Sequence, residues 1–441
     1  MQQPLACVAA ARRFALAYAL ASGLALAGPA LATAPATSAA EHWDFRWSDG
    51  FALQRGDGAF RLSFGGRLWL DGAVIEETPG LERDLEALGG AGEGNGVEVR
   101  RARIHFDGTA YERLFFRSQL DFAGGTPAFR DVFVGLRDLG PVGSVRVGQF
   151  KEPFFLDEQN NDDFIAFMER PTTNVFYPDR NVGVMATNTL AERRVLWQLA
   201  AFRDTDDFGA AFSSFGGTDW DVTARVTGLP LWEDQGRRLV HLGAAYLHRF
   251  RGSAERYAQR PEEHLADRFV DTGPFDATDA NVFDAELAWV EGPFSLQGEY
   301  THSLVEGRAG QPDLSFWGAY AQASWFPTGE QRVYDPATGA FGRVRPRASF
   351  DPSRGGWGAF ELVARTSYLD LSDDGVSGGE LLDLGAGVNW YPYPNARLML
   401  GYVHAVLSGR QADADPDPML AVPIHVSGRA HVVQTRFQVF F

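Results

Sequence analysis

The chain has 441 residues, 57 of them acidic and 40 basic, so its formal net charge is −17. This acidic balance argues against nucleic acid as a partner, and the lack of any apolar run of about 18 residues beyond residue 40 excludes a bundle of membrane-spanning helices. The 49 Gly, 34 Phe, 12 Tyr and 11 Trp are a high load of turn and aromatic residues, which favours an architecture of many strands.

Residues 1–40 are predicted to be a cleaved secretory signal peptide. Arg12 and Arg13 precede the apolar run FALAYALASGLAL, and small residues that could support cleavage follow it. The run of about 13 residues is too short to span a bilayer, which needs roughly 20. Cys7, the only cysteine, lies in this segment, so we expect residues 41–441 to form the mature domain without disulfides and with a net charge of −19, from 38 basic and 57 acidic residues.

Alternation of apolar and polar residues predicts β-strands from residue 59 to the end of the chain. In AFRLSFGGRLWLD, for example, Leu68 and Leu70 share one face while Arg67 and Asp71 share the other. The alternation fits a soluble sandwich as well as a membrane barrel, since it does not say which face meets lipid. About sixteen strands are predicted, an even number as single-chain outer-membrane barrels require, at 59–71, 100–108, 114–122, 129–138, 143–151, 181–189, 195–203, 219–228, 239–248, 282–290, 294–304, 315–326, 357–371, 380–391, 396–408 and 429–441.

The predicted connections alternate between short and long, as they do in outer-membrane barrels. In one long connection, LERDLEALGG spaces Leu81, Leu85 and Leu88 for a short helix. Segment 326–356 falls on the short-turn side, so either a strand there is miscounted or that turn is unusually long. The long connections are 76–96, 152–180, 204–218, 249–281 and 409–427.

Several short words identify a resemblance. They are GQFKEPF at 148–154, FMER at 167–170, YPDRNVG at 177–183, NWYP at 389–392 with NAR at 395–397, and the closing strand RAHVVQTRFQVFF. On these words the chain resembles the phosphate-selective porin O and P family of bacterial outer membranes. The resemblance implies an all-β fold, a transmembrane antiparallel β-barrel embedded in outer-membrane lipid, and, since porins of this kind are often homotrimers, a homotrimer.

The resemblance also implies that the segment after GQFKEPF forms a constriction loop folded into the barrel. Pro153 ends strand pairing, and Asp162 or Asp163 can cap a helical turn that carries Phe164 and Phe167. These apolar residues need a dry surface to pack on; the alternative is an external loop with a small cluster of its own. The acidic residues expected at the constriction are Glu152, Asp157, Glu158, Asp162 and Asp163.

Basic residues on the polar strand faces are the candidate pore lining, because cations between low-dielectric walls favour anions, and arginine matches phosphate through its planar donor fork. The candidates are Arg67, Arg101, Arg103, Arg117, Arg225, Arg365 and Arg436, joined near the constriction by Lys151, Arg170 and Arg180. The same faces carry Asp71, Asp107, Asp121, Asp221, Glu361 and Asp383. A mixed lining gives a transverse field and weak net selectivity, and Lys151, the only lysine, can fill at most one position of the lysine cluster that the family resemblance implies.

We therefore expect passive diffusion of small solutes, with anions such as phosphate or polyphosphate favoured, and no enzyme chemistry, cofactor or metal. The alternatives are a general, weakly selective porin for small nutrients, a structural barrel with a plugged lumen, and a barrel hydrolase. The hydrolase reading has one motif, Gly375-Val376-Ser377-Gly378-Gly379, which fits G-x-S-x-G but lies in a loop between two strand patterns instead of at a strand-to-helix turn.

Overall fold

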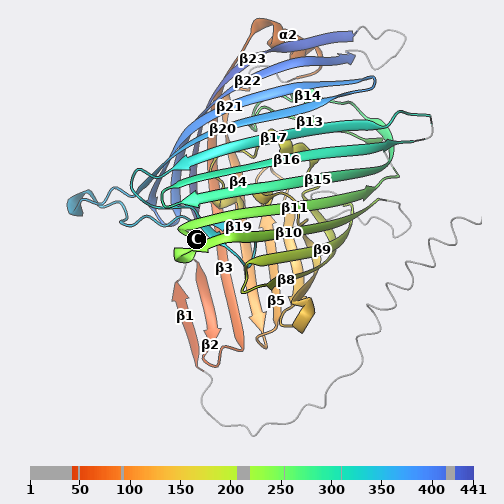
Figure 1. Ribbon diagram of the computed structural model, residues 1–441. Helices are drawn as coiled ribbons and strands as arrows, with labels where there is room; N and C mark the ends of the chain where they lie inside the picture. Colours follow the sequence, from red (N-terminus) through yellow and green to blue (C-terminus); the bar gives the residue numbers. More distant parts are fainter. Residues whose placement is uncertain are drawn as a thin grey trace, which may run out of the picture. The chain divides into compact units, whose positions relative to one another are not determined.

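Sixteen antiparallel strands close into a barrel in the computed structural model, which describes residues 42–47, 50–90, 94–205, 219–252, 254–308, 310–413 and 423–441 (Figure 1). The last strand pairs with the first from Ala430 opposite Glu77 to Phe440 opposite Arg67, which closes the sheet and confirms the predicted barrel. The barrel strands are β3 (Phe60–Glu77), β4 (Gly96–Ala110), β5 (Leu114–Asp121), β6 (Ala128–Leu136), β7 (Ser144–Lys151), β8 (Arg180–Leu190), β9 (Val195–Arg203), β10 (Trp220–Glu233), β11 (Arg238–Phe250), β15 (Phe275–Glu291), β16 (Phe294–Gly307), β17 (Leu314–Trp325), β20 (Ala359–Asp373), β21 (Val376–Tyr393), β22 (Ala396–Asp413) and β23 (Pro423–Phe440). Residues 1–40 lie outside the described residues, so the signal peptide stays a prediction.

The strand faces have the polarity of a membrane barrel. On β15, Phe283 and Leu287 are 46% and 53% exposed, whereas Asp284 and Glu286 are buried. A soluble protein would bury the apolar face, so the apolar band here faces lipid and the polar residues face the interior. No helix in the described ranges is long and apolar enough to span a membrane.

A hairpin of β1 (Trp43–Trp47) and β2 (Phe51–Arg55) precedes the barrel, and β2 pairs with the start of β3, where β23 has already ended. The C-terminal Phe441 exchanges backbone hydrogen bonds of 2.9 and 2.8 Å with Gly66. A Cβ at Gly66 would lie 2.8 Å from both the Arg103 carbonyl oxygen and the Phe441 ring, so this closure requires glycine.

Connections on one side of the barrel are short apart from 326–358, and most of those on the other side are longer, as predicted; the exception on that side is the tight turn 374–375 between β20 and β21. The longer 78–95 connection contains the expected short helix, α2 (Pro79–Ala87), with Leu81 and Leu85 buried. The short turns are 111–113, 137–143 with η2 (Gly140–Val142), 191–194, 234–237 with η5 (Asp234–Gly236), 292–293 and 394–395.

Three connections pack against inward-facing side chains of the barrel. The inserted loop, residues 152–179, contains α3 (Leu156–Gln159), η3 (Asp162–Phe164) and η4 (Thr172–Phe176). The second inserted loop, residues 251–274, contains β12 (Ala254–Glu255), β13 (Ala258–Gln259) and β14 (Val270–Asp271). The turn-side insert, residues 326–358, contains β18 (Val333–Asp335), β19 (Ala340–Gly342) and η6 (Pro352–Arg354). Because β18 pairs with β19 and with no barrel strand, segment 326–356 is an unusually long turn and no barrel strand was miscounted.

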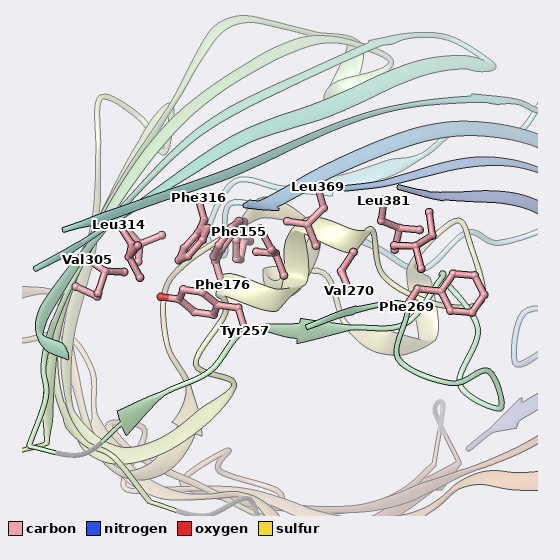
Figure 2. Packing of buried hydrophobic residues seen from close by; sticks show 14 of the residues in the cluster. Phe155, Phe176, Tyr257, Phe269, Val270, Val305, Leu314, Phe316, Leu369 and Leu381 are labelled. Atoms are coloured by element: carbon pink, nitrogen blue, oxygen red, sulfur yellow. The ribbon is translucent and has the colours of Figure 1, made fainter. Parts of the chain in front are cut away.

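The inserted loops form an apolar core inside the barrel. Figure 2 shows Phe176 of the inserted loop and Tyr257 of the second inserted loop beside Phe316 of β17, and the ring centroids are 5.2 and 5.7 Å apart along this row. On the inserted loop, Phe167 packs on Val363 of β20, so the barrel wall supplies the dry surface that these residues need. The alternative of an external loop is therefore wrong.

Candidate functional site

The inserted loop is fixed to the barrel wall through its own backbone. It has little regular structure, so its buried carbonyl oxygens need donors from elsewhere, and inward side chains of four strands supply them. The donors are Arg397 of β22 to Ile165, Asn389 of β21 to Ala166, Arg436 of β23 to Met168, and Arg365 of β20 to Glu169. On β16, Glu299 accepts from the backbone N–H groups of Leu156 and Asp157 at 2.6 and 2.9 Å. The loop is thus held on several sides of the barrel at once.

Asp162 of the inserted loop lies at the centre of a cluster of cations. Its Oδ1 is 3.0 Å from Lys151 Nζ and 2.6 Å from Arg170 Nη2. Its Oδ2 is 2.9 Å from Arg103 Nη1 and 3.0 Å from Arg101 Nη1. Burial alone would raise the pKa of Asp162, but the charges of Lys151, Arg170 and Arg103 outweigh it and hold the pKa well below its ordinary value.

Other carboxylates balance the same cations. Arg170 also pairs with Asp157 and Glu158, at 2.9 and 2.7 Å. Lys151 also pairs with Glu158, at 3.0 Å. The remaining pairs of the cluster are Arg67 with Asp163 at 3.1 Å and Arg103 with Asp121 at 2.6 Å. The structure thus brings together five of the predicted lining residues, and carboxylates of the inserted loop pair with all five.

The other predicted residues lie outside this cluster. Arg180 pairs with Asp131, at 2.8 Å, and Arg117 with Asp107, at 2.5 Å. The remaining three are Arg225, paired with Glu286, Arg365, paired with Glu262, and Arg436, paired with Asp71. Glu152, predicted at the constriction, is fully buried against the wall, where Asn181 and Thr223 donate to its carboxylate.

Strict alternation missed Arg100. Trp69 of β3 lies opposite Arg101, but Leu70 lies opposite Val99, so Arg100 is the extra residue of a β-bulge. Its guanidinium reaches Glu169 of the inserted loop through two bonds of 2.9 and 3.0 Å. The sequence carried one signal, because strict alternation would have placed a charged side chain against lipid.

The turn-side insert meets the inserted loop inside the barrel. The Phe341 N–H donates to Asn160 Oδ1 at 2.7 Å, and Tyr334 Oη lies 2.6 Å from His241 Nδ1 on β11. Arg225 of β10 donates to the Gly339 carbonyl oxygen at 2.9 Å. The lumen therefore holds polypeptide entering from both sides.

A cavity of about 400 Å³ remains between the wall and the two inserted loops. Its charged lining is mixed, with one more Lys or Arg than Asp or Glu. The cations are Arg100, Arg101, Arg130, Lys151, Arg170, Arg180 and Arg260, and the carboxylates are Glu158, Asp162, Glu169, Asp179, Glu262 and Glu263, with His264 beside them. Such a cavity can hold small ions through charge and hydrogen bonds, and its lining favours neither sign strongly.

The opposite wall is acidic. The carboxylates of Asp284, Glu286 and Glu299, on β15 and β16, lie within 4.8 Å of one another. Arg225 and His241 bind Glu286, while Glu299 accepts from the inserted loop, so Glu286 and Glu299 already serve as anchors. Ser377, from the G-x-S-x-G match, is the second residue of β21, directly after a strand-to-strand turn, where the motif needs a strand-to-helix elbow.

Comparisons with known proteins agree with this geometry. Residues 84–441 match the family model described as phosphate-selective porin O and P. An uncharacterised protein of Caulobacter vibrioides is 30% identical over 379 residues, 83% of this chain and 73% of that protein. Porin O of Pseudomonas aeruginosa is 25% identical over 459 residues, 92% of this chain and 97% of that one.

Solved structures share the fold at low sequence identity. An anion-selective porin from Comamonas acidovorans is similar with a TM-score of 0.54 and 13% identity, over 87% of this chain and all of that one. The trimer form of OmpT from Vibrio cholerae is similar with a TM-score of 0.51 and 10% identity, over 86% of this chain and 99% of the other.

Proposed function

The chain belongs to the phosphate-selective porin O and P family and forms a channel of the bacterial outer membrane, and we propose that this channel passes small anions by passive diffusion. An anion enters the cavity between the two inserted loops, exchanges part of its hydration for arginine contacts, and leaves down its gradient. Binding has to stay weak enough for release. The proposed lining is the predicted set of Arg67, Arg101, Arg103, Arg117, Lys151, Arg170, Arg180, Arg225, Arg365 and Arg436.

One observation carries this proposal: Lys151, Arg101, Arg103 and Arg170 converge on one point beside the cavity, where all four contact Asp162. Guanidinium and ammonium groups that already converge on an oxyanion provide the donors that phosphate or polyphosphate would need. The similar porins support the same reading, since one is described as anion-selective and another as Porin O.

A general, weakly selective porin is the second candidate, and the mixed charge of the cavity favours it. Six carboxylates line the cavity beside the seven cations, so the net field along it is small. We also propose a homotrimer, because a solved structure similar to this chain is described in a trimer form.

Single-channel recording of the refolded protein in a planar bilayer tests the proposal. Under a KCl gradient, an anion channel gives a reversal potential with the sign of the chloride equilibrium potential, and added phosphate blocks the chloride current. A reversal potential with the sign of the potassium equilibrium potential, together with no block by phosphate, would make the protein a general porin. Vesicle swelling in neutral sugars separates both from a plugged barrel, which passes neither sugar nor ion.

A triple variant tests the proposed lining. Replacing Arg101, Arg103 and Arg117 by Ala should move the reversal potential toward cations, because three positive charges leave the interior. The matched control replaces Arg193, Arg237 and Arg238, which are exposed at the short turns, and should leave the potential unchanged. An unchanged potential in the first variant would remove these three residues from the pathway.

A further inference from the structure

We propose that the Asp162 carboxylate is a built-in anion that occupies the cation cluster of the resting channel and sets how tightly a permeating anion is held. This inference rests on the proposed passage of anions. It assigns to one residue of the inserted loop the control of anion affinity.

Both oxygens of Asp162 are saturated by cations. Oδ1 contacts Lys151 and Arg170, and Oδ2 contacts Arg101 and Arg103, with distances of 2.6 to 3.0 Å. Arg67 Nη1 lies farther out, at 3.9 Å. A carboxylate offers about four acceptor positions on its two oxygens, so Asp162 uses the contacts that an incoming oxyanion would seek.

The cluster nevertheless has more donors than Asp162 can satisfy. Among the described residues, the buried atoms Arg67 Nε, Arg101 Nε and Arg103 Nη2 have no hydrogen-bond partner. Buried donors without acceptors are costly, and a tetrahedral oxyanion with more oxygens than a carboxylate can accept from more of them. The structure therefore favours phosphate-type anions over chloride whenever Asp162 gives way.

Arg101 depends most on Asp162. Each of the other cations has a second carboxylate partner, which is Asp163 for Arg67, Asp121 for Arg103, and Glu158 for both Lys151 and Arg170. Among the described residues, the carboxylate paired with Arg101 is Asp162, and Arg101 otherwise stacks on Trp69 at 4.8 Å. Neutralising Asp162 would therefore leave an uncompensated guanidinium at the edge of the cavity.

The loop should keep its place without this charge. The wall residues Arg397, Asn389, Arg436 and Arg365 hold its backbone downstream, and Glu299 holds it upstream. Asp162→Asn thus changes the charge of the cluster while the path of the loop remains, and the effect can be measured as anion binding.

The experiment measures the phosphate concentration that halves the chloride current through single channels of wild type and variants. Asp162→Asn should lower this concentration about tenfold, since about 1.4 kcal/mol of added attraction corresponds to that factor. Asp163→Asn is the matched control, because Asp163 is equally buried but pairs with Arg67 and Trp69. The double variant Asp162→Asn/Arg101→Gln restores the balance and should return toward wild type.

An Asp162→Asn channel that is folded and blocked at the wild-type concentration would overturn the inference. If that variant fails to insert, Asp162→Ser replaces it, because serine is smaller than asparagine and also removes the charge. A wild type without anion preference, combined with block in Asp162→Asn, would refute the proposed function and leave this inference standing. An anion-selective wild type whose Asp162→Asn variant is blocked at the same phosphate concentration would support the proposed function and refute this inference.

Discussion

Arg436 on the last barrel strand and Asp71 on the first form a bidentate ion pair across the seam that closes the barrel, with Nε–Oδ1 and Nη2–Oδ2 distances of 2.8 and 2.6 Å. The two residues lie directly opposite each other in the β23–β3 register. The same guanidinium binds the Met168 carbonyl oxygen and, at 2.8 Å, the Glu169 carboxylate. One side chain therefore couples barrel closure to the position of the inserted loop.

Replacing Arg436 by Gln should destabilise the barrel strongly. The Arg436 side chain is fully buried, so its loss leaves Asp71 without its cation, and breaking such a pair costs about 3–5 kcal/mol. Urea unfolding in lipid vesicles measures the free energy of unfolding. Arg238→Gln is the control, because its pair with Glu291 is about half exposed and should contribute less than about 1 kcal/mol. Equal losses in the two variants would contradict this role of the seam pair.

Shortening the turn-side insert should enlarge the conductance. Replacing residues 331–345 by a short Gly-Ser linker removes Tyr334, Gly339 and Phe341, which contact His241, Arg225 and Asn160 inside the barrel. Single-channel conductance in KCl should rise clearly above the wild-type spread. Replacing only the exposed Ser353 and Arg354 by Gly should not change it. A conductance unchanged by the deletion would mean that the insert lies beside the ion path and does not narrow it.

The anion preference should rise as the pH falls. Burial, reinforced by the charges of Glu169 and Asp71, raises the pKa of Glu263 to about 7. Below that pH the carboxyl is protonated and neutral, so the cavity carries one more net positive charge at pH 6 than at pH 8. Reversal potentials in a KCl gradient at the two pH values measure the shift. Glu263→Gln should give the acid value at both, and a pH dependence that persists in this variant would assign it to another group.

Alternation predicted most of the barrel because a strand in such a wall has one face to lipid and one to the interior. Arg67 and Arg436, for example, lie on the interior face, as the sequence predicts. The partners of these residues could not be predicted. Asp162 is 59 residues away from its partner Arg103 in the sequence, and Asp163 is 94 residues away from Trp69, which donates a hydrogen bond to it. No local pattern encodes such long-range contacts.

The inward fold of the turn-side insert was also beyond local patterns. Its position on the short-turn side marked it as unusual, but the sequence left open whether it was a miscounted strand or a long turn. The contacts that hold it, such as Tyr334 with His241, join residues 93 positions apart. Burial of Tyr334 and Phe341 against Leu156 explains why the segment enters the barrel, since these apolar side chains lose their contact with water there.

Cysteine labelling should test the bulge at Arg100 directly. Cys7 is the only native cysteine and lies in the predicted signal peptide, so a mature single-cysteine variant has no background. In the bulged strand, Arg100→Cys and Arg101→Cys both face the interior and should react with a charged thiol reagent added in water. Val99→Cys is the control, because Val99 is 48% exposed on the lipid face and should react only with a membrane-soluble maleimide. Without the bulge, strict alternation from the inward-facing Arg101 would place residue 100 on the lipid face with Ala102. An Arg100→Cys that reacts only with the maleimide would therefore refute the bulge and the Arg100–Glu169 ion pair together.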